Sequence, residues 1–198
     1  MNNLKFICLL LLVAVQVQSQ IINITGPAGS GQFGKTVTVL TNGNFVVTDP
    51  LYDAGAIADV GAVYLYNGVN HTLISTLKGS AANDNVGSNG ITPLSNGDYL
   101  VHSPSWNNGA TTGAGALTWC NGITGVSGVV SSSNSLVGSN VNDNVGGPYA
   151  FANLIIVLNN GNYLLRSPNW NNKAGAVTWA NGSTGITGII SSSNSLVG

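Results

Sequence analysis

Few side chains in this sequence could carry acid–base chemistry. Its two histidines are His71 and His102, and its only acids are six aspartates, because glutamate is absent. A glycosidase needs two carboxylates flanking the sugar bond, and the nearest pair in the sequence is Asp49 with Asp53. Both fall in a Pro- and Gly-rich loop, where aspartates commonly accept backbone N–H hydrogen bonds. We therefore expect structural roles for these acids and no enzymatic activity, with an exported hydrolase as the least favoured alternative.

Nucleophiles and metal ligands are equally sparse. No cluster of His, Cys and Asp has the spacing of a metal site, and no motif predicts a cofactor. Beyond Cys8, the only cysteine is Cys120, whose strand-like surroundings favour burial over an intermolecular disulfide. The serine run 131–133 recurs at 191–193 without a neighbouring histidine, which is typical of a turn.

The most suggestive polar and aromatic element is a tryptophan followed by two asparagines. It occurs as Trp106-Asn107-Asn108 and again as Trp170-Asn171-Asn172. A tryptophan stacked on a sugar ring, with asparagine amides reaching the hydroxyls, would form a lectin-like site. These residues are the candidate ligand-binding residues. The alternative, which we favour, is that the tryptophans fill gaps between neighbouring units while the asparagines cap the loop.

The composition excludes several classes of protein. Charged residues make up only 6% of the 198 residues, against about 25% in ordinary soluble domains, and the net charge is −1. A nucleic-acid-binding protein needs a basic face to displace counterions, and this chain has none. A hydrophobic content of 43% argues against a disordered tail. Low charge fits recognition by shape, hydrogen bonds and aromatic contact.

The first residues predict a secretory signal peptide over 1–19. Lys5 provides a positive charge, Phe6–Val15 form an apolar run, and Val17 and Ser19 precede a cleavage site before Gln20. The run is shorter than the roughly 20 apolar residues of a membrane span. A buried N-terminal helix or strand is the alternative. The prediction implies a secreted or cell-surface protein with no membrane span after cleavage.

An internal repeat organises the rest of the chain. The predicted units are 20–79, 80–138 and 139–198. Each unit contains one version of the phrase NGNFVV, at 42–47, 96–101 and 160–165, and one version of GAVYLYNG, at 61–68, 115–122 and 175–182. The octapeptide SSSNSLVG occurs at 131–138 and 191–198, and NDNVG opens two units, at 83–87 and 142–146.

The pattern within a unit is that of β-strands. Short apolar runs alternate between two faces, and in the second unit they predict strands over 90–94, 98–103, 114–120 and 126–136, the last interrupted. Trp119 and Trp179 share a face with Leu117 and Val177, so we expect both tryptophans in the core. The flanking Asn-Gly dipeptides predict tight hairpins at Asn42, Asn67, Asn96, Asn121, Asn160 and Asn181.

Four antiparallel strands per repeat predict an all-β fold. We expect a partial β-propeller of about three four-stranded blades, with a β-solenoid as the alternative. Propellers usually close with four to eight blades. Either the gene product continues beyond Gly198, which we favour, or several chains self-associate to close the ring.

The stretch Gly31–Gly68, with FGKTVTVL, NGNFVVTDP and AGAIADVGAVYLYNG, resembles the FG-GAP repeat of integrin α-subunit-type β-propellers. The later units resemble a repeat of unknown function in exported bacterial proteins, including filamentous-haemagglutinin-like adhesins. This resemblance implies a propeller blade and an extracellular adhesive role. Phe33-Gly34 is found only in the first unit, and the loop between the first two strands carries at most one carboxylate. Calcium takes six to eight oxygen ligands, so we expect no family-type calcium site.

These observations predict a secreted or cell-surface, non-catalytic repeat module for extracellular binding or adhesion. Its ligand would be a glycan or a protein, and a purely structural surface spacer is the alternative. Three Asn-x-Ser/Thr sequons, at Asn23, Asn70 and Asn181, are candidate N-glycosylation sites in a eukaryotic secretory route.

Overall fold

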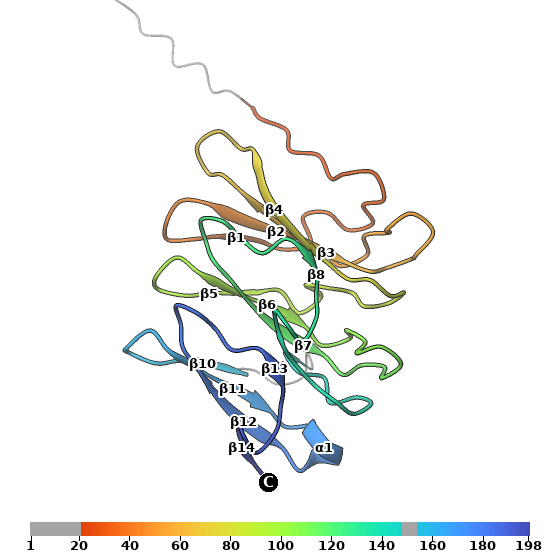
Figure 1. The fold of residues 1–198 in the computed structure, drawn as a ribbon. Helices are drawn as coiled ribbons and strands as arrows, with labels where there is room; N and C mark the ends of the chain where they lie inside the picture. Colours follow the sequence, from red (N-terminus) through yellow and green to blue (C-terminus); the bar gives the residue numbers. More distant parts are fainter. Residues whose placement is uncertain (1–20, 148–153) are drawn as a thin grey trace, which may run out of the picture.

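Three stacked sheets and one short helix make up the part of the chain that the computed structural model describes, residues 21–147 and 154–198 (Figure 1). The predicted signal peptide, residues 1–19, and Cys8 lie outside the described residues. The all-β fold with mostly antiparallel units is confirmed, and the arrangement is that of a partial propeller. Among the described residues the sheets do not close into a barrel.

The first sheet comes from the first unit except for one strand. It contains β1 (Val37–Val39), β2 (Phe45–Asp49), β3 (Ala62–Tyr66) and β4 (Leu73–Lys78), which pair antiparallel in chain order. The fifth strand, β8 (Gly128–Val129), comes from the second unit and pairs in parallel with β4.

The second sheet repeats this plan. Its own strands are β5 (Ile91–Pro93), β6 (Tyr99–Ser103), β7 (Ala116–Cys120) and β9 (Leu136–Val137), again antiparallel. The third unit contributes β13 (Gly188–Ile189), which pairs in parallel with β9. The strand predicted over 126–136 is interrupted, as expected, but its two parts lie in different sheets: β8 crosses to the preceding sheet, and β9 joins the sheet of its own unit.

The third sheet has four strands. They are β10 (Ile155–Val157), β11 (Tyr163–Ser167), β12 (Ala176–Ala180) and β14 (Leu196–Val197). The single helical turn among the described residues, α1 (Trp170–Lys173), lies between β11 and β12. Its two asparagines have left-handed backbone conformations, which asparagine tolerates better than most residues.

The Asn-Gly dipeptides fall into two classes. Those at 42, 96 and 160 form the tight hairpins that the sequence predicts, each with a positive-φ glycine, and in the first the Leu40 amide donates to the Asn44 carbonyl oxygen (2.8 Å). Those at 67, 121 and 181 do not. They begin longer loops in which the asparagine side chain accepts backbone N–H groups. The loop at Asn67 still returns to the same sheet, where β4 pairs with β3, whereas the loops at Asn121 and Asn181 lead to the edge of the preceding sheet.

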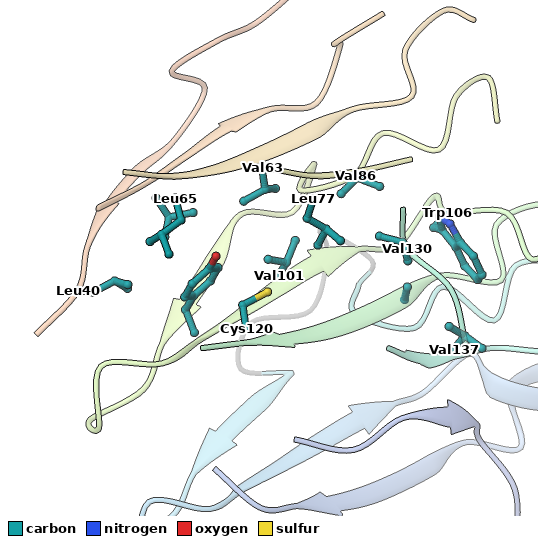
Figure 2. Packing of buried hydrophobic residues seen from close by; sticks show 13 residues of the cluster. Leu40, Val63, Leu65, Leu77, Val86, Val101, Trp106, Cys120, Val130 and Val137 are labelled. Carbon is teal, nitrogen blue, oxygen red and sulfur yellow. The ribbon is translucent and has the colours of Figure 1, made fainter. Parts of the chain in front are cut away.

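The core lies between the sheets. We call the face of each sheet that points to the following unit its outer face, and the opposite side its inner face. Figure 2 shows the first junction, where Val63, Leu65 and Leu77 from the outer face of the first sheet meet Val101 and Cys120 from the inner face of the second. The corresponding contact between the second and third sheets forms a second cluster. Alternating side chains therefore serve two different interfaces, which is why these strands are buried on both faces.

Two tryptophans that the sequence places in the core differ in the structure. Trp119 packs against the cluster of the second junction, and its indole N–H donates to the Gly182 carbonyl oxygen (2.9 Å). Trp179, at the equivalent position of the third unit, is 52% exposed, so the prediction of a core role is wrong for it. The reason is that no described segment covers the outer face of the third sheet.

Candidate functional site

The first copy of the Trp-Asn-Asn element is built into the junction of the first two units. Trp106 is only 4% exposed and belongs to the cluster between these sheets. The amide N–H and side-chain NH2 of Asn107 donate to Asp84 Oδ1 (3.0 and 2.9 Å), and Asn108 donates to the Gly138 carbonyl oxygen (3.1 Å). The indole presents no free face for a sugar. This copy matches the alternative in which tryptophan fills the gap and asparagines hold the loop.

The second copy is more open. Trp170 packs partly against the second junction cluster, while Asn171 and Asn172 are exposed. The Asn171 amide donates to Asp143 Oδ1 (2.9 Å), the same contact that Asn107 makes with Asp84. Both asparagine side chains project from the positive-φ turn of α1. Ligand binding by this copy stays a prediction.

A different feature, which sequence reasoning missed, lies on the inner face of the first sheet. It is a cavity of ≈ 500 Å³ whose lining includes Tyr52, Tyr64, Tyr66, Thr76 and Lys78. Ligand pockets commonly span about 300–1,000 Å³ and combine apolar walls with a few polar groups. The cavity's size and lining are therefore those of a small-ligand site.

The tyrosines are held in place by an aromatic cluster. Tyr66 stacks on Phe45 with ring centroids 5.3 Å apart and planes 10° apart, and Phe33 lies 5.5 Å from Tyr64. Tyr52 meets Tyr64 edge-on at 6.5 Å. Such pairs stabilise a defined ring geometry beyond simple area burial. The cavity is thus lined by rings whose orientation is set before any ligand arrives.

The Tyr64 hydroxyl is the distinctive polar group of this cavity. The residue is buried, and its oxygen has no hydrogen-bond partner among the described residues. Burial, followed by the nearby Asp49 carboxylate, raises the pKa of Tyr64 above its ordinary value, so the phenol stays protonated at neutral pH. A buried, unpaired hydroxyl costs free energy, and a ligand that hydrogen-bonds to it would recover that cost.

The equivalent positions in the other units show why the cavity is local. Where the first unit has Tyr64 and Thr76, the second has Thr118 and Ser135, whose hydroxyls bond to each other at 2.7 Å in the core. The sequence signal was the concentration of aromatic residues in the first unit at positions that are small elsewhere. This difference between the first unit and the others is hidden by the otherwise similar phrases of the three units.

The acids have structural partners. Asp49 Oδ1 accepts the Gln32 backbone N–H and Asp53 Oδ1 accepts the Asp59 backbone N–H (2.6 and 2.8 Å), as predicted for both, although Asp49 ends β2 rather than lying in a loop. Asp98 Oδ1 accepts the Gly122 amide N–H (2.9 Å). Within residues 21–147 and 154–198, no three His, Cys, Asp or Glu side chains gather as metal ligands.

The N-D-N-V-G phrases join consecutive units. Asp84 Oδ2 accepts the backbone N–H groups of Ser80 and Ala81 (2.8 Å each), while its Oδ1 accepts the two donors of Asn107 in the next loop. Asp143 repeats the arrangement one unit later. The asparagines on both sides of each aspartate have positive φ, between 45° and 62°. A single buried carboxylate therefore holds the phrase to the Trp-Asn-Asn loop of its own unit, while the backbone of the phrase bonds to the preceding unit, as Val86 does to Val60.

His102 and Cys120 are also buried. His102 Nδ1 lies 3.0 Å from the Gly146 carbonyl oxygen, which can only accept, so Nδ1 carries the proton and Nε2 faces the Thr92 hydroxyl (2.8 Å). Burial lowers the pKa of His102, which keeps the ring neutral. Cys120 is buried as predicted, and burial raises its pKa to about 12, which suppresses the nucleophilic thiolate.

The candidate glycosylation sites are accessible. Asn23, Asn70 and Asn181 are all exposed. Asn70 and Asn181 already accept backbone N–H groups from the residues two positions later. No helix in the described part of the chain has the length and apolarity needed to cross a bilayer.

Comparison with protein families agrees with the three structural units. A family model described as a repeat of unknown function, DUF5650, matches residues 39–88, 93–147 and 157–198. The chain belongs to this family. Each DUF5650 match covers the central strands of one sheet together with the segment that reaches its neighbour. No curated protein matches the chain.

Proposed function

We propose that the chain is a non-catalytic module that acts outside the cell and binds part of a glycan in the tyrosine-lined cavity of the first sheet. The observation that carries this proposal is the buried Tyr64 hydroxyl, unpaired among the described residues, in a cavity walled by Tyr52 and Tyr66. The signal-peptide pattern supports export. The resemblance to FG-GAP and adhesin-like repeats supports an adhesive role.

The chemistry of the lining favours a sugar. Tyr52 is the half-buried ring of the lining and offers an apolar face on which a pyranose can stack, whereas Tyr64 and Tyr66 are 3% and 7% exposed and present no free ring face. Thr76 adds a second hydroxyl, and the half-buried Lys78 adds a positive charge that would attract an acidic sugar. Glycans carrying a carboxylate are therefore the preferred class.

A non-catalytic role follows from how the acids are used. Each oxygen of Asp84 is committed to two protein donors, and Asp98 and Asp143 are buried in similar networks. A general acid or nucleophile must instead reach a substrate. These networks support a structural use of the carboxylates.

A sharp test is Tyr64→Phe on a glycan array. Because the hydroxyl has no partner among the residues that the structure describes, its removal should leave thermal stability unchanged or slightly raised, while binding falls by about fivefold to tenfold with the loss of one hydrogen bond. Lys78→Met should reduce binding of acidic glycans more than of neutral ones. Tyr99→Phe is the matched control, since Tyr99 is buried in the junction away from the cavity.

A Trp170→Ala variant separates this site from the exposed loop of the third unit. Binding that survives Tyr64→Phe and is abolished by Trp170→Ala would move the site to Trp170, Asn171 and Asn172. The second candidate function, a structural spacer, is favoured by the bonds between units that make them one continuous stack, such as Val86 to Val60 and Val145 to Ala114. Absence of binding to any neutral or acidic glycan would favour the spacer.

A further inference from the structure

The two copies of the octapeptide SSSNSLVG lie in different environments. Residues 131–138 and 191–198 have the same sequence and form the same turn and strand. Leu136 of the first copy is 0% exposed, whereas Leu196 of the second is 79% exposed. Because the sequences are identical, the difference comes only from what packs on them. Leu136 is covered by the third unit, and no described segment covers Leu196.

The same contrast extends over the whole outer face of the third sheet. The register places Leu164, Arg166 and Val177 on this face, in the positions that Leu100, His102 and Leu117 occupy in the second sheet. The second-sheet residues are all buried, while Arg166 and Val177 are exposed and Leu164 is half-buried. Trp179, on the same face, is also exposed. Contiguous apolar surface of this kind marks an interaction site.

The backbone edge of this sheet also lacks a partner strand among the described residues. In the first two sheets the outermost strand pairs in parallel with a strand of the following unit, β4 with β8 and β9 with β13. Among the described strands, the corresponding strand of the third sheet, β14, pairs only with β12. An open strand edge is a template for one more strand.

A groove lies where the next N-D-N-V-G phrase would sit. At the start of the second and third units the valine of that phrase donates its amide N–H to a carbonyl oxygen of the preceding unit, Val86 to Val60 and Val145 to Ala114 (3.1 Å each). The equivalent carbonyl in the third unit belongs to Ala174. It lines a groove of ≈ 440 Å³ together with Val177 and the 196–198 segment.

The glycines next to these carbonyls show that the space is filled at the first two junctions and open at the third unit. A Cβ added at Gly61 or Gly115 would overlap the backbone of Val86 or Val145. A Cβ at Gly175 would meet nothing closer than the Pro168 carbonyl oxygen at 3.8 Å. The groove therefore has the shape that a following repeat fills at both earlier junctions.

We infer that the outer face of the third sheet is a docking surface for a further repeat of the DUF5650 type. Such a repeat would seat an N-D-N-V-G loop in the groove at Ala174 and add a parallel strand to β14. It would place a tyrosine and small residues over Val177 and Trp179, as Tyr163, Ala176 and Ala180 are placed over the second sheet. The Arg166 guanidinium would donate to the loop's glycine carbonyl, the partner that His102 has in Gly146.

The inner face of this chain's own first unit does not fit the same place. That face is already covered by Ile24, Phe33 and Tyr52, which pack on Tyr64 and Tyr66. Such atypical end units are how repeat proteins stop a stack from growing. The occupant must therefore be a repeat without this cap, rather than the N-terminal end of a second copy.

The test extends the full chain by a second copy of residues 139–198 after Gly198, with both tryptophans of the added copy replaced by Phe. The fluorescence of Trp179 is isolated by subtracting the spectrum of the same chain carrying Trp179→Phe. If the added repeat docks, Trp179 emission shifts to shorter wavelength and its quenching by acrylamide falls to the level of Trp119. The control carries Asp143→Asn and Val145→Asp in the added copy alone, and its Trp179 should stay as quenchable as in the unextended chain.

Two results would overturn the inference. One is that acrylamide quenches Trp179 in the extended chain as strongly as in the unextended chain, whether or not circular dichroism shows the added copy to be folded. The other is a Trp179 in the unextended chain whose quenching falls as protein concentration rises, together with dimers in sedimentation. That result would assign the face to a second copy of the chain.

Discussion

Replacing Asp84 by asparagine tests how much one carboxylate contributes to holding the N-D-N-V-G phrase at the junction of the first two units. Asp84 is fully buried, and its two oxygens accept four hydrogen bonds, two from the turn at Ser80 and Ala81 and two from Asn107. Asparagine has nearly the same shape but keeps only one accepting oxygen. Its NH2 group must then face two N–H donors, on one side or the other, so two of the four bonds are lost.

The magnitude follows from those two bonds. A hydrogen bond to a charged group contributes about 1.5–3 kcal/mol, so Asp84→Asn should lower the free energy of unfolding by about 3–6 kcal/mol. The matched control is Asp53→Asn. Asp53 is exposed and accepts one backbone N–H, from Asp59, so its loss should be within about 1 kcal/mol.

Urea unfolding followed by tryptophan fluorescence and by far-ultraviolet circular dichroism measures both variants. Coincident transitions of the two probes would allow one free energy to be assigned to each protein. With coincident transitions both probes report the same loss, and Trp106, in the junction and next to Asn107, gives fluorescence a reporter close to the substitution. A loss for Asp84→Asn no greater than that of Asp53→Asn would refute the reasoning, because it would mean that the buried carboxylate contributes nothing beyond a surface one.

Three further outcomes are expected. The pKa of His102 is lowered in the folded protein, so below about pH 6.5, its ordinary pKa, this histidine binds a proton in the unfolded chain and stays neutral in the folded one. Stability should therefore fall with pH from about 6.5 downward, by at most about 1.4 kcal/mol per pH unit from this group, and His102→Gln should flatten this part of a pH series of urea midpoints. Gly122→Ala should lower the free energy of unfolding by about 1–3 kcal/mol, because the added Cβ would overlap the Gly97 carbonyl oxygen. Gly43→Ala, whose added Cβ meets open space, should lower it by about 1 kcal/mol. Equal decreases in the melting temperature of the two variants would contradict the predicted overlap. Cys120 should react with a thiol reagent only as fast as the protein unfolds, since it is buried and its pKa is raised to about 12; rapid labelling of the native protein would contradict this.

Much of the local structure could be predicted from the sequence. The hairpins at Asn42, Asn96 and Asn160 follow from the preference of Asn-Gly for tight turns between apolar runs. The burial of Cys120 follows from alternation in its strand. The tight hairpin predicted from the same dipeptide at Asn121 is wrong, because the next strand, β8, pairs with β4 of the preceding sheet. A local sequence pattern carries no information about pairing at that distance along the chain.

The candidate site was less predictable. Trp106 and Trp170 belong to matching phrases, yet one is sealed in a junction and the other lies beside exposed asparagines. The tyrosine cavity depends on how residues 24–33 fold over the first sheet. That arrangement joins segments far apart in the chain, and no periodicity within either segment encodes it.

By itself, the sequence determined the all-β character, the three units and the turn positions, because these depend on backbone preferences and on side chains within a few residues of one another. Only the tertiary structure decided which strand of a unit crosses to its neighbour, which loop each buried aspartate holds and which faces stay open. The identical octapeptides at 131–138 and 191–198 show the reason. Whether a residue is buried depends on what other part of the chain packs against it. The same eight residues are buried where a following unit covers them and exposed where no described unit does.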